Sequence, residues 1–297
     1  MIHKYLVIGK NGTIGSALYA RLQSMGASVW GTIHRPEAVD QQNVFYLNLL
    51  DQPSSWVFPN IQFDIVYLCA GICRMDLCEE DHIRTRQTNV KGMIALACHF
   101  SDAGATVVYL STNQVFSGNV PFVSATAPYQ PQNEYGHQKA ETEDLLKRYC
   151  QQWIIVRLTK VVEQNMLLIK NWIDLLTNNQ PIQSFHDMML APVSLREVID
   201  VLVLLGKTKQ TGYYQISGAV DISYYILANY LADCLGRSRS LVESVSAIEK
   251  GVKKIFLPLV TTLDCSSTIA FCDWKPPHFS EVVHECFDIS VCESSVI

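Results

Sequence analysis

Charge is scarce in this sequence. Asp, Glu, Lys and Arg account for 17% of the 297 residues, and the formal net charge is −5. No run or stripe of Lys and Arg is present to create the positive surface with which proteins attract nucleic acid. We therefore expect no nucleic acid partner, and an anionic ligand would need a local site. The hydrophobic share of 48% is enough for a sizeable core and argues against a disordered chain.

Long apolar runs are lacking as well. The longest stretches fall short of the roughly 20 residues that a membrane-spanning helix requires, so we expect no membrane partner. The opening residues, MIHKYLVIGK, become strand-like after one lysine and show no secretory cleavage segment. We therefore expect a cytoplasmic protein.

Paired cysteine motifs are absent, although the chain has ten cysteines. No Cys-x-x-Cys occurs, and the spacing of Cys69, Cys73 and Cys78 fits no zinc pattern. Several cysteines lie within apolar runs, as Cys69 does in VYLCAGI. We expect reduced, packed thiols and no metal site.

Strand and helix patterns alternate in the first half of the chain. Continuous apolar runs, typical of strands buried on both faces of a sheet, are separated by segments of helical spacing such as residues 13–26. The expected strands are residues 5–9, 27–33, 43–49, 64–71, 105–112 and 153–158. This alternation predicts an α/β fold, a Rossmann-like doubly wound parallel sheet with helices on both faces.

The second half is less regular. Short extended pieces such as GYYQISG lie between helical patterns near residues 164–178, 194–206 and 223–236. We expect a large domain at residues 1–160 and a smaller C-terminal lobe at 161–297. The boundary is soft, with some interleaving, and the two parts should share a cleft.

Three glycines follow the first expected strand. The segment VIGKNGTIGSAL places Gly9, Gly12 and Gly15 where that strand gives way to a helix. Small residues there permit a tight turn, a close approach of backbone to a pyrophosphate and close packing of the helix. The helix N-terminus also offers free amides to phosphates. The spacing is G-x-x-G-x-x-G rather than the usual G-x-G-x-x-G, yet its position predicts a dinucleotide site.

The end of the second expected strand bears on the choice of dinucleotide. NAD sites usually place an acidic residue there to hold the ribose hydroxyls. Here the stretch reads WGTIHRPE, and no acid occupies residues 32–35. Arg35 could instead meet a 2′-phosphate with His34 beside it, so NADP is expected and NAD stays an alternative.

A tyrosine and a lysine lie four residues apart in NEYGHQKAE. In a helix this spacing puts Tyr135 and Lys139 on one face. A nearby ammonium lowers the pKa of a phenol from about 10, so Tyr135 could give a proton to a carbonyl oxygen while a hydride reaches the carbon. Ser111 and Thr112 end the fifth expected strand, where ligands of open parallel sheets bind, and a hydroxyl there could hold that oxygen.

Taken together, these segments resemble the extended short-chain dehydrogenase/reductase family. Within it the chain is most similar to the dTDP-4-dehydrorhamnose reductases, the sugar-nucleotide-binding group. The segments GKNGTIG, STNQVFSG, RQTNVKG and PQNEYGHQKAETE carry the resemblance, and later patterns extend it over essentially the whole chain. The implied reaction is the NADP-dependent reduction of a keto group on a nucleotide-linked sugar.

The resemblance also implies roles for parts of the chain. Residues 1–160 would bind NAD(P), and residues 161–297 would bind the substrate. Asn89 would have a structural and proton-relay role, and Lys139 would bind the nicotinamide ribose. The implied catalytic set is Thr112, Tyr135 and Lys139. The expected cofactor contacts are Gly9, Asn11, Gly12, Thr13, Ile14, Gly15, His34, Arg35, Ala70, Gly71, Asn89, Tyr135 and Lys139.

Several positions depart from the pattern of that group. Asn113 stands where the reductases have aspartate, and Gln114 where they have tyrosine. The dehydratases of the family need an Asp-Glu pair here, and amides cannot shuttle protons in that way, which argues against a dehydratase. Leu68 and the stretches 191–193 and 257–264 also differ, in parts that choose the substrate, so the identity of the sugar stays open.

Two other functions remain. One is a sugar-nucleotide epimerase that uses transient oxidation at the same site. The other is a non-enzymatic, NADP-binding regulatory subunit, because the methionine adenosyltransferase regulatory subunit looks like a reductase of this group yet binds a partner enzyme. The resemblance alone implies a homodimer. Arg157 suits either a phosphate or ribose contact or a buried ion pair. His186 and Asp187 suit either the cleft or a plain loop.

Overall fold

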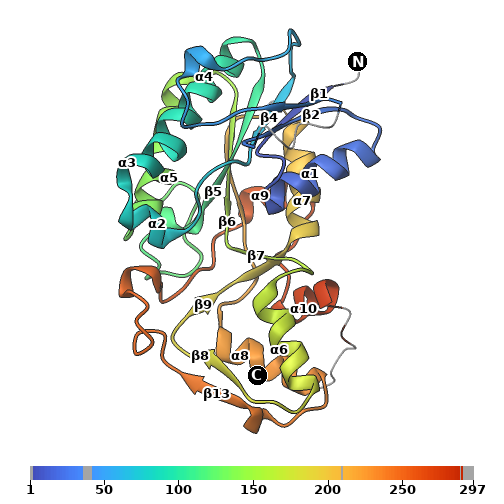
Figure 1. Ribbon diagram of the computed structural model, residues 1–297, viewed down its shortest axis with the longest axis vertical. Helices are drawn as coiled ribbons and strands as arrows, with labels where there is room; N and C mark the ends of the chain where they lie inside the picture. Colours follow the sequence, from blue (N-terminus) through green and yellow to red (C-terminus); the bar gives the residue numbers. More distant parts are fainter. Residues whose placement is uncertain (1–2, 36–41, 209, 288, 290–297) are drawn as a thin grey trace.

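A parallel sheet of seven strands forms the centre of the larger lobe (Figure 1). The computed structural model describes residues 3–35, 42–208, 210–287 and 289. In spatial order the strands are β11 (Gly212–Ile216), β6 (Trp153–Leu158), β5 (Thr106–Thr112), β4 (Ile65–Leu68), β1 (Lys4–Ile8), β2 (Ser28–Ile33) and β3 (Val44–Tyr46). All neighbouring pairs are parallel, which confirms the predicted Rossmann-like α/β fold.

The strand order reverses beside β1. From β1 the chain builds outward through β2 to β3, and it then returns to β4 on the other side of β1. In open α/β sheets such a switch point leaves a crevice at the carboxyl ends of the strands, where ligands bind. The residues that follow β1, β2, β4 and β5 therefore meet at one edge of the sheet.

Helices cover both faces of the sheet, which is why its strands are apolar on both sides. α1 (Thr13–Ser24) and α7 (Leu195–Gly206) share one apolar core with the sheet, and α4 (Met93–Asp102) and α5 (Glu134–Tyr149) lie on the other face. Figure 1 shows the two pairs on opposite sides. The other helical segments of this lobe are η2 (Pro53–Ser55), α2 (Met75–Glu80), α3 (His82–Arg86), the π-helical η3 (Gln87–Gly92), η4 (Asn113–Val115) and α9 (Ser266–Cys272).

The smaller lobe lies at the opposite end from α4 and has a core of its own (Figure 1). Its helical segments are α6 (Leu167–Thr177), α8 (Tyr224–Cys234), η5 (Arg239–Leu241), η6 (Lys254–Phe256) and α10 (Phe279–Phe287). Its strands pair as β7 (Lys160–Val162) with β10 (Pro192–Ser194), β8 (Ile182–Phe185) with β13 (Val242–Val245), and β9 (Met189–Leu190) with β12 (Ile222–Ser223). Within the described part of the chain, no helix combines the length and apolar character that crossing a bilayer requires.

The segment GYYQISG contributes the edge strand β11 to the large sheet. β11 pairs with β6 in the register Tyr214 to Val156, and α7 also packs against the sheet. The chain therefore crosses between the lobes more than once after residue 160. Periodicity could not reveal this, because a short apolar strand has the same pattern in either lobe. The division at residue 160 stays a prediction.

Candidate active site

Two of the three glycines in the turn between β1 and α1 are required because a side chain would clash with neighbouring backbone. Gly9 has φ of +86°, and a Cβ there would lie 2.8 Å from the Cα of Ala70. A Cβ on Gly15 would lie 2.2 Å from the carbonyl oxygen of Gly9, so only glycine lets α1 start this close to β1. Gly12 is different, since its Cβ would meet the same oxygen at an ordinary 3.5 Å.

The remaining turn residues surround the start of α1. Gly12 is the N-cap of that helix and has no side chain to cap the first turn. Asn11 and Thr13 are exposed beside it, and Ile14 is half-buried. A helix N-terminus of this kind attracts anions through its amides and dipole. The predicted phosphate contacts therefore lie on one turn, at the switch point of the sheet.

A cavity of about 260 Å³ opens beside this turn. Four of the predicted cofactor contacts line it, namely Gly9, His34, Ala70 and Gly71. These come from the ends of β1, β2 and β4, so the cavity follows the carboxyl edge of the sheet. Arg35 is exposed next to His34, outside the lining of the cavity.

Sequence reasoning missed several residues of this cavity. Thr32, Asn48, Leu49, Arg84 and Thr88 line it together with the predicted set. Asn48 follows β3, and its Oδ1 accepts a hydrogen bond from the backbone of Leu50 at 3.1 Å. The expected strand at residues 43–49 contained Asn48, whereas β3 ends at Tyr46, so only the structure places Asn48 at the edge where polar residues after parallel strands gather. Arg84 and Thr88 come from helical segments, and no pattern in the sequence points to them.

Asn89 lies in the π-helical segment η3 and is fully engaged with the protein. Its Oδ1 accepts from the backbone N–H of Ile72 at 2.8 Å, and its Nδ2 donates to the carbonyl oxygen of Ile72 at 3.0 Å. Nδ2 also donates to Oε1 of Gln138 at 2.8 Å, so Asn89 ties the segment after β4 to α5. These hydrogen bonds support a structural role for Asn89, and its role in a proton relay stays a prediction.

Helix α5 is positioned by its first turn. Asn133 caps it, accepting a hydrogen bond from the backbone of Gly136 at 2.9 Å. A Cβ on Gly136 would lie 2.2 Å from the carbonyl oxygen of Gln114, so the helix start sits directly on the turn after β5. The same helix brings Nζ of Lys139 to the carbonyl oxygen of Leu110 at 2.7 Å. The helix thus contacts the chain on both sides of Thr112.

Lys139 is buried beneath two phenol rings. Its Nζ lies 4.6 Å from the ring centroid of Tyr109 and 5.8 Å from that of Tyr135. Burial lowers the pKa of Lys139, but the nearby Tyr109 phenol and Cys73 thiol more than offset this, so the pKa is raised and the ammonium stays charged. The structure therefore brings the predicted cation to the predicted acid.

The pKa of Tyr135 moves in the direction opposite to the expected one. Burial raises it well above the ordinary value of 10.0, and the neighbouring Cys73 and Tyr109 add to the increase. The expectation of a lowered pKa is therefore wrong for the protein alone. The reason is that burial removes the hydration that stabilises a phenolate. The attraction of the ammonium beside the ring is too weak to offset this loss. Tyr135 is accordingly a protonated phenol at neutral pH, which is the form that can donate.

The two hydroxyls at the end of β5 have different partners. Oγ1 of Thr112 donates to Oδ1 of Asn113 at 3.3 Å and accepts from the backbone of Gln114 at 3.2 Å. Oγ of Ser111 donates to Oε1 of Glu143 in the interior. Successive side chains of a strand point to opposite faces, which explains the separation. Ser111 is thereby engaged inside the protein, whereas Thr112 stays at the edge where ligands bind.

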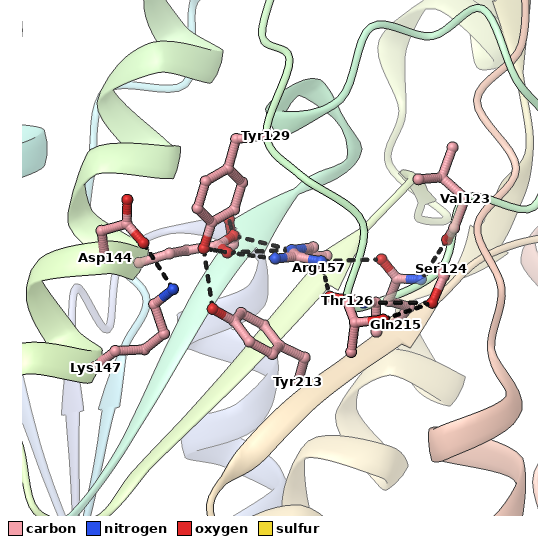
Figure 2. Close-up of polar contacts among 12 residues, drawn as sticks. Val123, Ser124, Thr126, Tyr129, Asp144, Lys147, Arg157, Tyr213 and Gln215 are labelled. Atoms are coloured by element: carbon pink, nitrogen blue, oxygen red, sulfur yellow. Dashed lines mark hydrogen bonds and ion pairs between the residues drawn. The ribbon is translucent and has the colours of Figure 1, made fainter.

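Of the two interpretations of Arg157, a ligand contact or a buried ion pair, the structure shows the ion pair. Its Nη2 lies 2.7 Å from Oε2 of Glu143, and 1% of its side chain is exposed. Figure 2 shows Arg157 between Tyr129 and Tyr213 on one side and Gln215 on the other. A guanidinium enclosed in this way is not available to a phosphate or ribose.

His186 and Asp187 make hydrogen bonds within the smaller lobe. Asp187 accepts from Oγ of Ser246 at 2.6 Å and from the backbone of Ala247 at 2.7 Å. Nδ1 of His186 lies 3.2 Å from Oγ of Ser244. Both contacts join the segment after β8 to β13 and the turn that follows it, which accounts for the pair without a ligand.

Two of the cysteines near the site, Cys69 and Cys78, are protonated thiols. Burial raises the pKa of Cys69 to about 12 and that of Cys78 to about 11. Cys73 is exposed, and its Sγ lies 4.0 Å from the carbonyl oxygen of Gly71. Within the residues that the structure describes, no group of three or more His, Cys, Asp and Glu side chains is arranged to hold a metal ion.

A second groove runs between the site and the smaller lobe. It has a volume of about 330 Å³ and is lined by residues from the β5 end and from the loop around η6, including Gln114, Phe116, Gln132, Lys254 and Leu257. Gln114 and the stretch 257–264, which Leu257 opens, are positions at which the sequence departs from the pattern that the resemblance implies. Gln114 and the first three residues of the stretch 257–264 thus share one groove.

The fold and the site together define a protein of the extended short-chain dehydrogenase/reductase class, with a glycine turn at the switch point and a Tyr-Lys pair on the helix that packs against β5. The chain belongs to the family described as RmlD substrate binding domain, whose model matches residues 3–292. This confirms the resemblance seen in the sequence.

Individual relatives are distant but extend over most of the chain. The spore coat polysaccharide biosynthesis protein SpsK of Bacillus subtilis is 24% identical over 95% of this chain and 96% of its own length. A dTDP-4-dehydrorhamnose reductase of Escherichia coli is 24% identical over 74% of each chain. Methionine adenosyltransferase 2 subunit beta of Mus musculus is 23% identical over 89% of this chain and 80% of its own.

Solved structures share the fold. The dTDP-4-dehydrorhamnose reductase of Bacillus anthracis, determined in complex with NADP, superposes with a TM-score of 0.82. The match covers 96% of this chain and 99% of that one, at 20% sequence identity.

Proposed function

We propose that this protein reduces a keto group on a nucleotide-linked sugar with NADPH. The observation that carries the proposal is the buried Tyr135–Lys139 pair, held against the end of β5 at the edge of the sheet where the glycine turn opens. Family membership and the NADP-bound relative support the same chemistry.

The residues present fit a dinucleotide. The turn from Gly9 to Gly15 offers backbone amides to a pyrophosphate, and the cavity beside His34 suits the adenosine end. No acid stands at the end of β2, and His34 with Arg35 supplies polar and cationic groups there, which favours a 2′-phosphate and hence NADP. When bound, the nicotinamide supplies the hydride.

The side chains of this protein would supply the proton and hold the reacting oxygen. Tyr135 keeps its proton at neutral pH, because burial raises its pKa, and it would release that proton to the substrate oxygen as negative charge develops there. The charged Lys139 beneath the ring would stabilise the phenolate that remains. Thr112 would donate a hydrogen bond to the same oxygen in place of its weak bond to Asn113.

A Tyr135→Phe variant tests the proposal directly. It should bind NADPH as the wild type does but lose about 10²- to 10⁴-fold in turnover, the usual contribution of a positioned acid. Turnover is followed as oxidation of NADPH, with NADH in parallel, across a panel of 4-keto nucleotide sugars. His137→Gln is the matched control, because His137 lies on the same helix and is exposed. Full turnover by Tyr135→Phe would remove Tyr135 from the mechanism.

A non-enzymatic regulatory subunit is the second candidate. The similarity to methionine adenosyltransferase 2 subunit beta supports it, as do the divergent residues around Gln114. The complete set of Thr112, Tyr135 and Lys139 weighs against it, because a scaffold has no need of these side chains. A stoichiometric partner in a pull-down, with no NADPH oxidation by the wild type over the whole panel, would favour this candidate.

A further inference from the structure

Glu143 and Arg157 form an ion pair sealed inside the larger lobe, and the mechanism proposed above does not use it. The two side chains are 0% and 1% exposed, and Nη2 of Arg157 lies 2.7 Å from Oε2 of Glu143. Nε of Arg157 also donates to both carboxylate oxygens, at 3.1 and 3.2 Å. The guanidinium therefore grips the carboxylate through two nitrogens, the arrangement with the strictest geometry.

Each oxygen of Glu143 has a further donor. Oγ of Ser111 donates to Oε1, and the hydroxyl of Tyr129 donates to Oε2 at 2.9 Å. On the other side, Nη1 of Arg157 donates to the carbonyl oxygen of Ala125 at 2.9 Å. The pair thus joins the end of β5, the loop before α5, α5 itself and β6.

Three aromatic rings enclose the guanidinium. Its Cζ lies 4.4 Å from the ring centroid of Tyr213, 4.8 Å from that of Phe116 and 5.5 Å from that of Tyr129. Figure 2 shows how Tyr129 and Tyr213 reach each other beside Arg157, and their hydroxyls are 3.0 Å apart. Cation–π contacts from several rings therefore add to the ion pair in holding the guanidinium in place.

The position of Glu143 connects the pair to the reactive groups. Glu143 follows Lys139 by four residues and Tyr135 by eight, so all three lie on one stripe of α5. At about 1.5 Å per residue, Glu143 is about 6 Å along the helix axis from Lys139 and about 12 Å from Tyr135. On β5, Ser111 directly precedes Thr112. One ion pair therefore holds the helix and the strand that carry all three proposed catalytic side chains.

Stability alone is a poor explanation for this pair. Taking two charges out of water costs nearly as much as their attraction returns, and apolar residues of similar size often stabilise a fold equally well. What a forked, fully hydrogen-bonded pair adds is a fixed relative position of the elements that carry it.

We propose that Glu143 and Arg157 are positioning residues that set the distance of Tyr135 and Lys139 on α5 from Thr112 on β5. The inference rests on the proposed function, since it concerns the geometry of the same three side chains. Neither member of the pair contacts the substrate in this proposal; both act through the elements that they join.

Two variants of different severity test the proposal. Glu143→Gln keeps the shape but removes the charge opposite Arg157, and Ser111→Ala removes one bond between β5 and the carboxylate. Asp144→Asn is the matched control: it makes the same acid-to-amide change one residue later on α5, where the carboxylate is 45% exposed and pairs with Lys147 at 2.7 Å.

The measurements separate position from stability. We expect kcat with saturating keto sugar to fall at least 10-fold in both variants at a temperature where circular dichroism shows them folded, with KM for the sugar within about 2-fold of the wild type. We also expect the Kd of NADPH to rise several-fold, because the nicotinamide end depends on Lys139. The Kd of adenosine 2′,5′-bisphosphate, which occupies only the adenosine end, should be unchanged. Asp144→Asn should match the wild type throughout.

The outcomes are distinguishable. Folded Glu143→Gln and Ser111→Ala proteins with wild-type kcat and wild-type NADPH affinity would overturn the positioning role, even if their melting temperatures fall. If Glu143→Gln does not fold, Ser111→Ala alone decides by the same criteria. If the wild type reduces no keto sugar, the proposed function fails, and the contrast between NADPH and the bisphosphate still decides the positioning role.

Discussion

Tyr135 is a buried acid whose setting favours the protonated form. Desolvation is the largest cause of its raised pKa, and the Cys73 thiol and the Tyr109 phenol act in the same direction. The ammonium of Lys139, 5.8 Å from the ring centroid, is the group that favours phenolate. In the protein alone, desolvation is the larger effect, so the pKa of Tyr135 is raised and its hydroxyl stays protonated at neutral pH.

This balance predicts the alkaline behaviour of Tyr135. Because its pKa is higher in the folded state than in the unfolded chain, Tyr135 contributes stability that is complete below about pH 10 and is lost as the pH rises further. In an ultraviolet absorbance titration, Tyr135→Phe should therefore remove no phenolate signal below about pH 10. A signal between pH 7 and 9 that disappears in this variant would contradict the raised pKa.

At the scale of elements, the caps decide where the long helices begin. Asn133 caps α5, and Ser194 with Glu197 forms a reciprocal capping box at the start of α7. The box is visible in the sequence as SLRE ahead of an apolar helix, a pattern that predicts a helix start. Both caps matter here because α5 carries Tyr135 and Lys139, the pair proposed to be catalytic, and α7 packs on the opposite face of the sheet.

Removing the box from α7 has a predictable cost. Ser194 is fully buried, and its Oγ accepts from the backbone of Glu197 at 3.2 Å. Ser194→Ala should lower the free energy of unfolding by about 1 kcal/mol, within the range of about 0.5 to 2 kcal/mol for a lost N-cap. Urea denaturation measures this, with Ser24→Ala as control, whose exposed hydroxyl donates to the carbonyl oxygen of Arg21 at 2.8 Å. The control should lie within about 0.5 kcal/mol of the wild type, and an equal loss in both would rule out the cap as the cause.

At the scale of the whole molecule, the two lobes meet at the start of α5. The loop around η6 returns from the smaller lobe, and Nδ2 of Asn133 donates to the carbonyl oxygen of Ile255 at 3.2 Å. The same nitrogen donates to Oε1 of Gln114 at 2.9 Å. One buried amide thus links α5, which carries the proposed catalytic pair, the turn after Thr112 and the smaller lobe.

Asn133→Asp tests this link, because it keeps the oxygen that caps α5 but replaces the donor with an acceptor. Two acceptors, on Gln114 and Ile255, would then face a carboxylate, at a cost of about 1 to 3 kcal/mol. We expect faster hydrogen exchange in residues 254–261, with the rest of the smaller lobe protected as before. Asn178→Asp is the control, since Asn178 is exposed and is the C-cap residue of α6. Unchanged exchange in the loop would show that Asn133 does not hold it.

Local sequence patterns were sufficient to predict several strands of the sheet and the main residues of the candidate site. The expected strands at 5–9, 105–112 and 153–158 agree with β1, β5 and β6 to within one residue at each end, because buried strands need only a continuous apolar run. The glycine turn and the Tyr135–Lys139 stripe were predictable for the same reason, since both depend on spacing of a few residues along the chain.

Features that depend on distant segments could not be predicted in this way. The cavity residues Arg84 and Thr88 come from helical segments far in sequence from the glycine turn. The partner of Arg157 lies on a helix, and its enclosing ring Tyr213 comes from β11, which the sequence pattern left in the smaller lobe. No local spacing contains such information, because each contact depends on how the elements pack.

By itself, the sequence determined the order of the elements, the dinucleotide turn and the residue types of the proposed catalytic set, since each follows from periodicity or composition over one or two turns of chain. Only the tertiary structure decided that β11 completes the sheet, that Ser111 turns inward to Glu143, and that Tyr135 holds its proton more tightly than a free phenol. Those outcomes depend on burial and on electrostatic neighbours, and both exist only after remote segments have packed together.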